Sequence, residues 1–141
     1  MGAHSDYGCA TILLADRVPG LQIRDDDGEF HDVLPPAGGF LVNLGDLLAE
    51  WTNDRWRATV HRVVPPGPDM AGDVRRRSIA WFHQPNHDAV IDVLPSCIDD
   101  AHPAKYPSTT SGEHLMAKLM GPRAGASVDV DAAFLDTEPA G

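Results

Sequence analysis

The sequence predicts a mainly β protein, a sandwich or a barrel, with one helix near its C-terminal end. Short runs of β-branched and aliphatic residues recur at near-regular intervals along the first two thirds of the 141 residues, as is typical of strands. The chain contains 13 glycines and 12 prolines, many of which separate these runs and therefore predict frequent turns. Apolar residues at helical spacing stand out near residues 114–120.

Each predicted strand is bounded by turn-forming residues. Residues 25–28, Asp-Asp-Asp-Gly, are typical of a hairpin turn, and residues 65–72 are expected to form a loop because they contain three prolines and two glycines. The predicted strands are residues 9–14, 21–24, 29–33, 40–44, 58–64, 75–83 and 89–94.

Two helices are expected. Residues 45–51 suit one or two helical turns with Asp46 near the start. Residues 110–113, Thr-Ser-Gly-Glu, match a capping box before a helix over 114–120. We expect residues 1–120 to form one domain, because the small and acidic residues of 121–141 lack periodicity and are typical of a flexible tail.

The charge balance and the cysteine count exclude several classes of protein. The formal net charge of −10 disfavours nucleic-acid binding. No apolar run approaches the roughly 20 residues needed to cross a bilayer, and no signal peptide is recognisable at the start. Cys9 and Cys97 alone cannot form a disulfide framework, which favours a cytoplasmic protein. No pattern indicates an oligomeric state.

His4 and Asp6 form the first candidate site. Side chains two residues apart on an extended chain point to the same side, so these two could bind one metal ion. His61, within the predicted strand 58–64, is the candidate third ligand. Two histidines and one carboxylate are the facial triad of non-haem Fe(II) oxygenases. On these residues alone, a surface turn and a structural histidine remain the alternative.

Arg76 and Ser78 form the second candidate site, because they share one side of the predicted strand 75–83. A guanidinium binds a carboxylate through two hydrogen bonds. The alternative is a solvated turn of three arginines, but the apolar residues 79–82 predict that the strand enters a core. Alternation then places four more side chains toward the same interior: Thr59, Val63, Ala80 and Phe82.

The other histidines lack ligand-like spacing, and we interpret His31, His83, His87, His102 and His114 as structural or exposed. The three tryptophans are expected in the core or in a lid: Trp51, Trp56 and Trp81.

Several motifs occur in a fixed order along the chain. They are His4-Ser5-Asp6-Tyr7-Gly8, Gly20-Leu21-Gln22-Ile23, Val42-Asn43-Leu44-Gly45-Asp46, His61-Arg62-Val63-Val64, Arg76-Arg77-Ser78 and Phe82-His83-Gln84-Pro85-Asn86. Over about residues 3–120 the chain resembles the isopenicillin N synthase-like branch of the 2-oxoglutarate and Fe(II)-dependent oxygenases. Ser5 stands where threonine is common in that family.

The resemblance implies a double-stranded β-helix, the jelly-roll barrel of these enzymes. It implies that His4, Asp6 and His61 bind Fe(II), and that Arg76 and Ser78 hold the distal carboxylate of 2-oxoglutarate. A dioxygenase of this kind uses O₂ to oxidise a small-molecule substrate, by hydroxylation or a related reaction, and releases succinate and CO₂. The alternatives are an isopenicillin N synthase-like oxidase that uses no 2-oxoglutarate, and an inactive binding module.

Family members carry a long N-terminal portion before the His-x-Asp motif. We therefore expect this chain to be the C-terminal catalytic portion of an oxygenase roughly twice as long, with a jelly-roll core that lacks its N-terminal portion. His4 would lie close to a terminus that is expected to fray.

Overall fold

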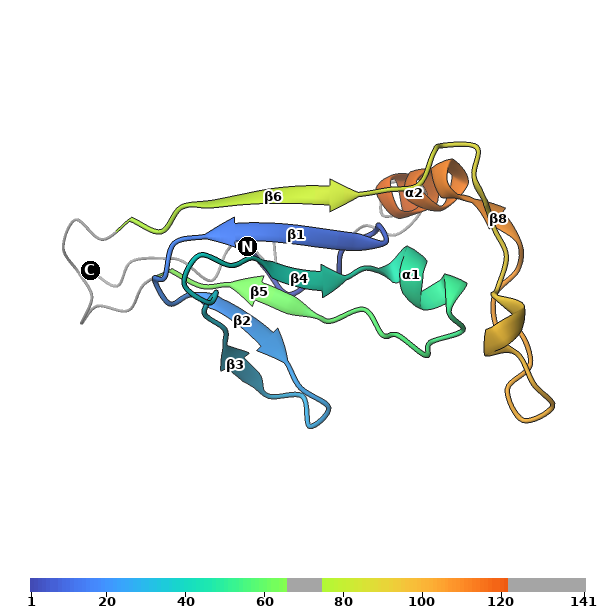
Figure 1. The fold of residues 1–141 in the computed structure, drawn as a ribbon, viewed down its shortest axis with the longest axis horizontal. Coiled ribbons are helices and arrows are strands. Elements are labelled where there is room, and N and C mark those ends of the chain that lie inside the picture. Colours follow the sequence, from blue (N-terminus) through green and yellow to red (C-terminus); the bar gives the residue numbers. More distant parts are fainter. Residues whose placement is uncertain (66–74, 122–141) are drawn as a thin grey trace.

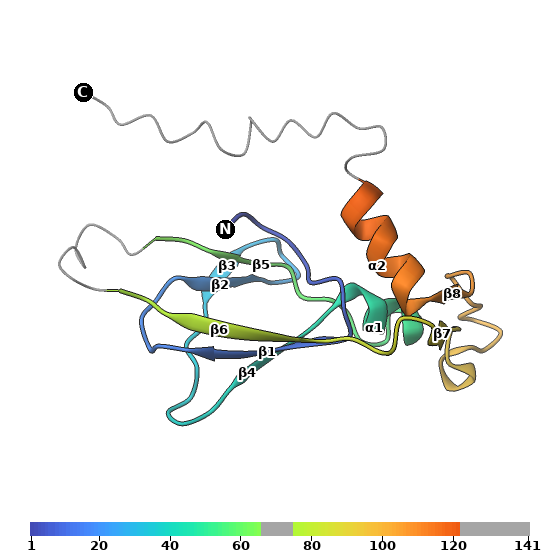
Figure 2. The same cartoon turned by 90° about the horizontal axis from the view of Figure 1, so that it is seen from above.

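Two three-stranded antiparallel sheets form the body of the protein and face each other (Figures 1 and 2). The computed structural model describes residues 1–65 and 75–121, and it confirms the mainly β class. One sheet has the order β4-β1-β6, with strands Leu41–Leu44, Ala10–Ala15 and Ser78–His83. The other has the order β3-β2-β5, with strands Phe30–Asp32, Leu21–Arg24 and His61–Val63.

The chain passes repeatedly from one sheet to the other. Strands β1, β4 and β6 belong to the first sheet, whereas the β2–β3 hairpin and β5 belong to the second. Crossings of this kind are the mark of a jelly roll. They bring residues from the beginning, the middle and the end of the chain to the space between the sheets.

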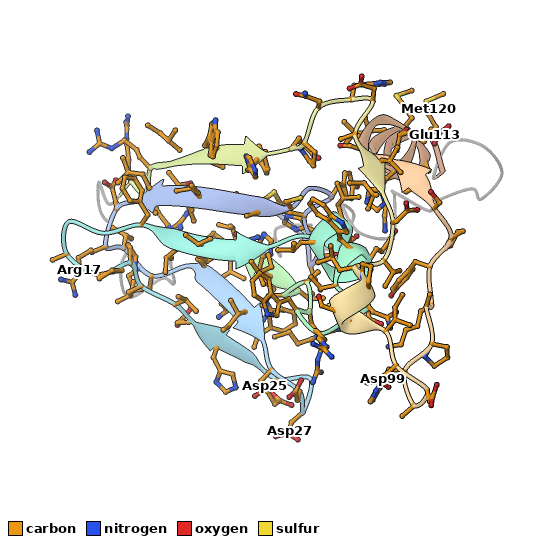
Figure 3. All side chains as sticks on the ribbon, turned by 45° about the vertical axis from the view of Figure 1, so that its right-hand side comes forward. Arg17, Asp25, Asp27, Asp99, Glu113 and Met120 are labelled. Carbon is orange, nitrogen blue, oxygen red and sulfur yellow. The ribbon has the colours of Figure 1, made fainter. Side chains whose placement is uncertain are left out.

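The β2–β3 hairpin turns where the sequence predicts. Asp25 N–H donates to the Glu29 carbonyl at 2.9 Å, and Gly28 has a φ of +88°, which favours glycine. Figure 3 shows Asp25 at this turn. The hydrogen bond from exposed His31 is the main reason why the pKa of the Asp25 carboxyl lies below its usual value. His31 is thus exposed and paired, as predicted.

Strand β6 is exposed on both faces, so the expectation that it enters a core is wrong. The exposed fractions of Ile79, Trp81 and Phe82 are 69%, 58% and 60%. The reason is that β6 lies at the edge of its sheet with β1 as its partner, and no described element covers the outer face that Ile79 and Trp81 share. Trp56 is 57% exposed, so it is not a core residue either.

The hydrophobic core is a small cluster beside the sheets rather than between them. Cys9, Leu47 and Ile91 are buried together, and Trp51 packs against them. Leu47 and Trp51 belong to helix α1, Asp46–Trp51, which begins at Asp46 as expected, and Ile91 belongs to strand β7, Val90–Ile91. Burial raises the pKa of the Cys9 thiol, which makes it a poor nucleophile.

Helix α2, Ser111–Met120, closes the described chain and rises from one end of the sheets (Figure 2). The predicted capping box is present: the Thr110 side chain accepts from Glu113 N–H, and the Glu113 carboxylate accepts from Thr110 N–H. Two short elements escaped prediction, the 3-10 helix η2, Pro95–Cys97, and strand β8, Thr109–Thr110, which pairs with β7.

Most predicted strands are shorter in the structure, most clearly β5, which keeps three residues of the predicted seven. Residues 66–72 of the predicted loop and 122–141 of the predicted tail lie outside the described residues. Neither described helix is long and apolar enough to cross a membrane.

Tyr106 and Asp54 tie the segment after η2 to the end of α1. The Tyr106 hydroxyl donates to Asp54 Oδ1 at 2.7 Å, and this bond is the main reason why the pKa of Tyr106 rises from 10.0 to about 12. Because the folded pKa is raised, this stabilisation is complete below about pH 10 and is lost as the pH rises toward 12.

We expect Tyr106→Phe to lower the free energy of unfolding by about 0.5–1.5 kcal/mol near neutral pH. The variant should also lose less stability than the wild type between about pH 10 and 12. Denaturant unfolding across that pH range measures both effects, with Tyr7→Phe as the control for the loss of a hydroxyl. Parallel stability curves for wild type and Tyr106→Phe would show that the bond contributes nothing.

Candidate metal and carboxylate site

The N-terminal segment is bonded to β5, which places His4 beside His61. His4 N–H donates to the His61 carbonyl at 3.0 Å, and His61 N–H donates to the His4 carbonyl at 2.9 Å. The Met1 carbonyl accepts a third bond from Val63 N–H at 3.0 Å. These bonds hold the two imidazole centroids 4.4 Å apart, so the expectation of a frayed terminus at His4 is wrong.

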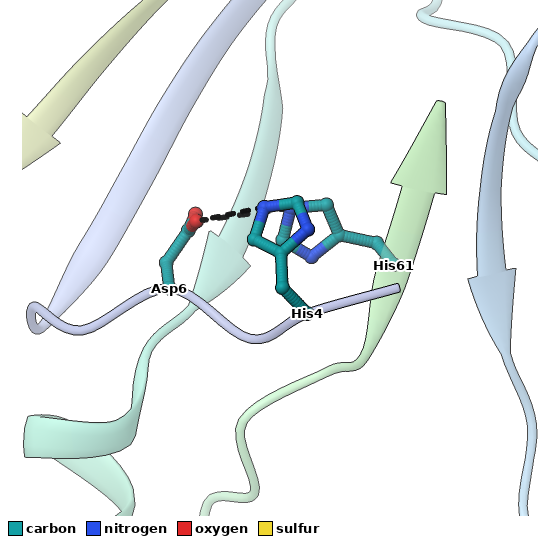
Figure 4. Close-up of side chains that lie close together, drawn as sticks. All are labelled: His4, Asp6 and His61. Atoms are coloured by element: carbon teal, nitrogen blue, oxygen red, sulfur yellow. Dashed lines mark ion pairs between the residues drawn. The ribbon is translucent and has the colours of Figure 1, made fainter. Parts of the chain in front are cut away.

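His4, Asp6 and His61 converge on one point (Figure 4). Asp6 Oδ1 lies 3.7 Å from His4 Nε2 and 3.8 Å from His61 Nε2. Each pair is close enough for one ion to bridge at bond lengths of about 2.0–2.2 Å. Asp6 and His61 are buried, whereas His4 is partly exposed. The structure therefore brings together the three residues predicted as metal ligands.

Both histidines present the same ring nitrogen to Asp6. His4 Nδ1 lies 2.8 Å from the Gly2 carbonyl, and His61 Nδ1 lies 3.0 Å from the Thr59 carbonyl. A carbonyl only accepts, so each Nδ1 carries the proton and each Nε2 keeps its lone pair. Such outer bonds fix the tautomer and the ring orientation of metal-binding histidines.

Asp6 is held by two donors that the sequence did not single out as functional. Its Oδ2 accepts from Thr11 Oγ1 on β1 and, at 2.7 Å, from Asn43 Nδ2 on β4. A polar residue in the middle of an otherwise apolar strand is the signal that could have found both. Asn43 also lies within one of the motifs that carry the family resemblance.

Gly45 allows the backbone around Asp6 to close. Asp46 N–H donates to the Asp6 carbonyl at 2.7 Å, and Gly45 N–H donates to the Cys9 carbonyl at 3.0 Å. A Cβ at position 45 would lie 2.2 Å from the Gly8 carbonyl oxygen, a distance that backbone atoms cannot tolerate. The Gly-Asp pair after β4 is thus explained by its contact with the His-x-Asp segment.

Gly45→Ala is expected to lower the free energy of unfolding by about 1–3 kcal/mol, the usual effect of forcing a methyl group into a filled space. Thermal unfolding measures this, with Gly2→Ala as the matched control because nothing lies within 4 Å of that added methyl group. Equal destabilisation by the two variants would contradict the close approach seen at Gly45.

Arg76 and Ser78 form the polar group predicted to bind a carboxylate. Arg76 Nη1 lies 3.4 Å from Ser78 Oγ. Arg76 Nε is buried and has no hydrogen-bond partner within the described chain. A buried donor without a partner is unfavourable, and a carboxylate would satisfy it. The orphaned guanidinium nitrogen therefore fits an anionic ligand that bonds to Arg76.

The metal triad and the Arg76–Ser78 pair open into one cavity of about 310 Å³. The four side chains expected from strand alternation to face this interior do so: Thr59, Val63, Ala80 and Phe82. The other lining residues are mostly apolar: Met1, Leu13, Leu21, Ile23, Val33, Leu41 and Val42, with Thr11 and Asn43 beside Asp6. A mostly apolar cavity with a few convergent polar groups is typical of a ligand site.

Residues 1–85 match the sequence profile described as the 2OG-Fe(II) oxygenase superfamily. The chain belongs to this superfamily. Its members use Fe(II), 2-oxoglutarate and O₂, and the family expected from the motifs is confirmed.

Individual relatives of the superfamily match most of this chain. The 2-oxoglutarate-Fe(II) type oxidoreductase hxnY of Emericella nidulans is 42% identical over 111 residues, which cover 78% of this chain and 30% of that protein. Homoarginine-6-hydroxylase of Oryza sativa subsp. japonica is 36% identical over 121 residues, with 84% and 35% covered. The chain thus spans about a third of the length of these relatives.

Solved structures confirm the jelly-roll fold of the superfamily. A full-length oxygenase of Neurospora crassa, in complex with alpha-KG (2-oxoglutarate), superimposes with a TM-score of 0.76 at 41% identity. The match covers 85% of this chain and 36% of that one.

Proposed function

We propose that this chain carries the Fe(II) and 2-oxoglutarate site of a dioxygenase that oxidises a small organic molecule and releases succinate and CO₂. The observation that carries the proposal is the shared cavity of the metal triad and the Arg76–Ser78 pair. A triad alone would serve many metals, and an arginine alone many anions. The two together suit an oxo acid that reaches the metal with one end and the guanidinium with the other.

Each polar residue of the cavity has a role in this proposal. His4 Nε2, His61 Nε2 and Asp6 Oδ1 would hold Fe(II), which when bound supplies the activation of O₂. Arg76 and Ser78 would bind the distal carboxylate of 2-oxoglutarate and so orient its oxo acid end toward the metal. The apolar lining would exclude water from the methylene carbons of the co-substrate.

Neighbouring structures support a small substrate. The N. crassa oxygenase has been solved with thymine and with 5-formyluracil, and JOX2 with 2OG, Fe and JA. For this chain we propose a small molecule rather than a nucleic acid, because the net charge of −10 opposes binding of a polyanion. We treat residues 1–120 as one catalytic unit and place it in the cytoplasm, since Cys9 and Cys97 are free thiols.

Release of succinate tests the proposal. The chain is loaded with Fe(II) under anaerobic conditions, mixed with 2-oxoglutarate and a panel of small molecules, and exposed to O₂. We expect succinate from the wild type and none above background from His61→Ala. Substrate oxidation without loss of 2-oxoglutarate would instead indicate an oxidase, and metal binding that does not depend on His61 would indicate a binding module.

A further inference from the structure

The two oxygens of the Asp6 carboxylate have unequal surroundings. Oδ2 accepts hydrogen bonds from Thr11 Oγ1 and Asn43 Nδ2, whereas Oδ1 is the oxygen that faces both histidine Nε2 atoms. Asp6 is 8% exposed and Thr11 is 4% exposed, so water competes little for these bonds. The carboxylate is therefore held with one oxygen bonded to the protein and the other directed at the metal position.

The register of the sheet fixes the two donors. Thr11 on β1 lies directly opposite Asn43 on β4 in the antiparallel ladder, so their side chains project from the same face of the sheet. Both line the cavity. The pair is thus built into the sheet, and it meets Asp6 from one side while the histidines meet it from the other.

We infer that Thr11 and Asn43 are positioning residues that restrict Asp6 to a single metal–oxygen bond through Oδ1. A carboxylate can bind a metal through one oxygen or through both. Two donors on Oδ2 occupy its lone pairs and oppose the rotation that would bring it to the metal. Resting on the proposed function, the consequence is that a six-coordinate ion keeps three open positions, two for the oxo acid and one for O₂.

A purely structural role would be different. In that case Thr11 and Asn43 would only satisfy a buried carboxylate, and their loss would lower stability without changing how Asp6 binds a metal. Under our inference, their loss frees Oδ2 to bind the metal, removes one open position and weakens the binding of 2-oxoglutarate to the loaded protein.

The experiment uses Co(II) as the metal and the double variant Thr11→Val with Asn43→Ala. X-ray absorption of the Co(II)-loaded double variant is expected to show both oxygens of one carboxylate on the metal. Its affinity for 2-oxoglutarate, measured at saturating Co(II), should fall about tenfold, within the range for loss of outer-shell partners. Thr11→Ser, which keeps the hydroxyl group, should retain wild-type behaviour, as should Leu14→Ala on the outer face of β1.

Co(II)-loaded wild-type protein provides the second measurement, which holds even where the double variant does not fold. One carboxylate oxygen on the metal supports the inference. Two oxygens on the metal in the wild type, or one oxygen and unchanged 2-oxoglutarate affinity in the double variant, would overturn it and leave the proposed function intact. A wild-type chain that binds no Co(II) would overturn the proposed function itself.

Discussion

His61→Ala is expected to lower the Fe(II) affinity of the chain by at least about 100-fold. Loss of an outer-shell partner alone weakens metal binding by about 10–100-fold, and His61 is proposed to donate directly through Nε2. Its removal leaves one histidine and one carboxylate, too few donors to hold the ion. Anaerobic titration with Fe(II), followed by calorimetry or by competition with a chelator, measures the effect.

His31→Ala is the matched control for this prediction. His31 and His61 flank the same residue of β2, because both are paired with Ile23 in the sheet. His31 is exposed and bonds to Asp25, so its removal should leave the Fe(II) affinity unchanged. Equal losses of affinity in the two variants would point to damage to the sheet rather than loss of a ligand.

Arg76→Ala is expected to weaken 2-oxoglutarate binding to the metal-loaded chain by about 10- to 100-fold. A hydrogen bond to a charged group contributes about 1.5–3 kcal/mol, and the buried Nε of Arg76 has no partner within the described chain to replace the ligand. The metal affinity should not change, because Arg76 is not a proposed ligand. Titration of 2-oxoglutarate into Co(II)-loaded protein separates the two affinities.

Arg77→Ala serves as the control for position 76. Arg77 is exposed and its side chain bonds to Asp16 at 3.2 Å. Hydrogen bonds from Arg77, first from its backbone N–H and then from its side chain, hold the pKa of the Asp16 carboxyl below its usual value. Loss of the Arg77 side chain should not affect 2-oxoglutarate. Arg76→Lys keeps the charge but not the paired donors, so we expect an intermediate affinity. Wild-type affinity in Arg76→Ala would refute the assignment of Arg76.

The metal ligands could be predicted because two different kinds of pattern converge on them. His4 and Asp6 are related by local spacing, which an extended chain converts directly into shared orientation. His61 and Arg76 depend on the order of motifs along the chain, and strand alternation then placed Phe82 and Val63 in the cavity correctly. Local geometry and motif order were sufficient for the first ring of polar groups.

The residues that support the ligands could not be predicted, because their role depends on register between distant strands. Thr11 and Asn43 meet only once β1 and β4 pair, and no local spacing predicts that pairing. The two-residue strand β8 escaped prediction because two residues show no periodicity. Burial of Trp81 was predicted wrongly because an apolar strand is buried only where another element covers it.

The dependence of 2-oxoglutarate binding on the metal tests the central claim most directly. If the triad and Arg76 serve one ligand in one cavity, calorimetry of the anaerobic wild type should show one 2-oxoglutarate bound per chain when Fe(II) is present. Binding should weaken strongly without the metal, in His61→Ala and in Arg76→Ala. Binding of equal strength with and without Fe(II) would contradict the claim that the two groups form one site.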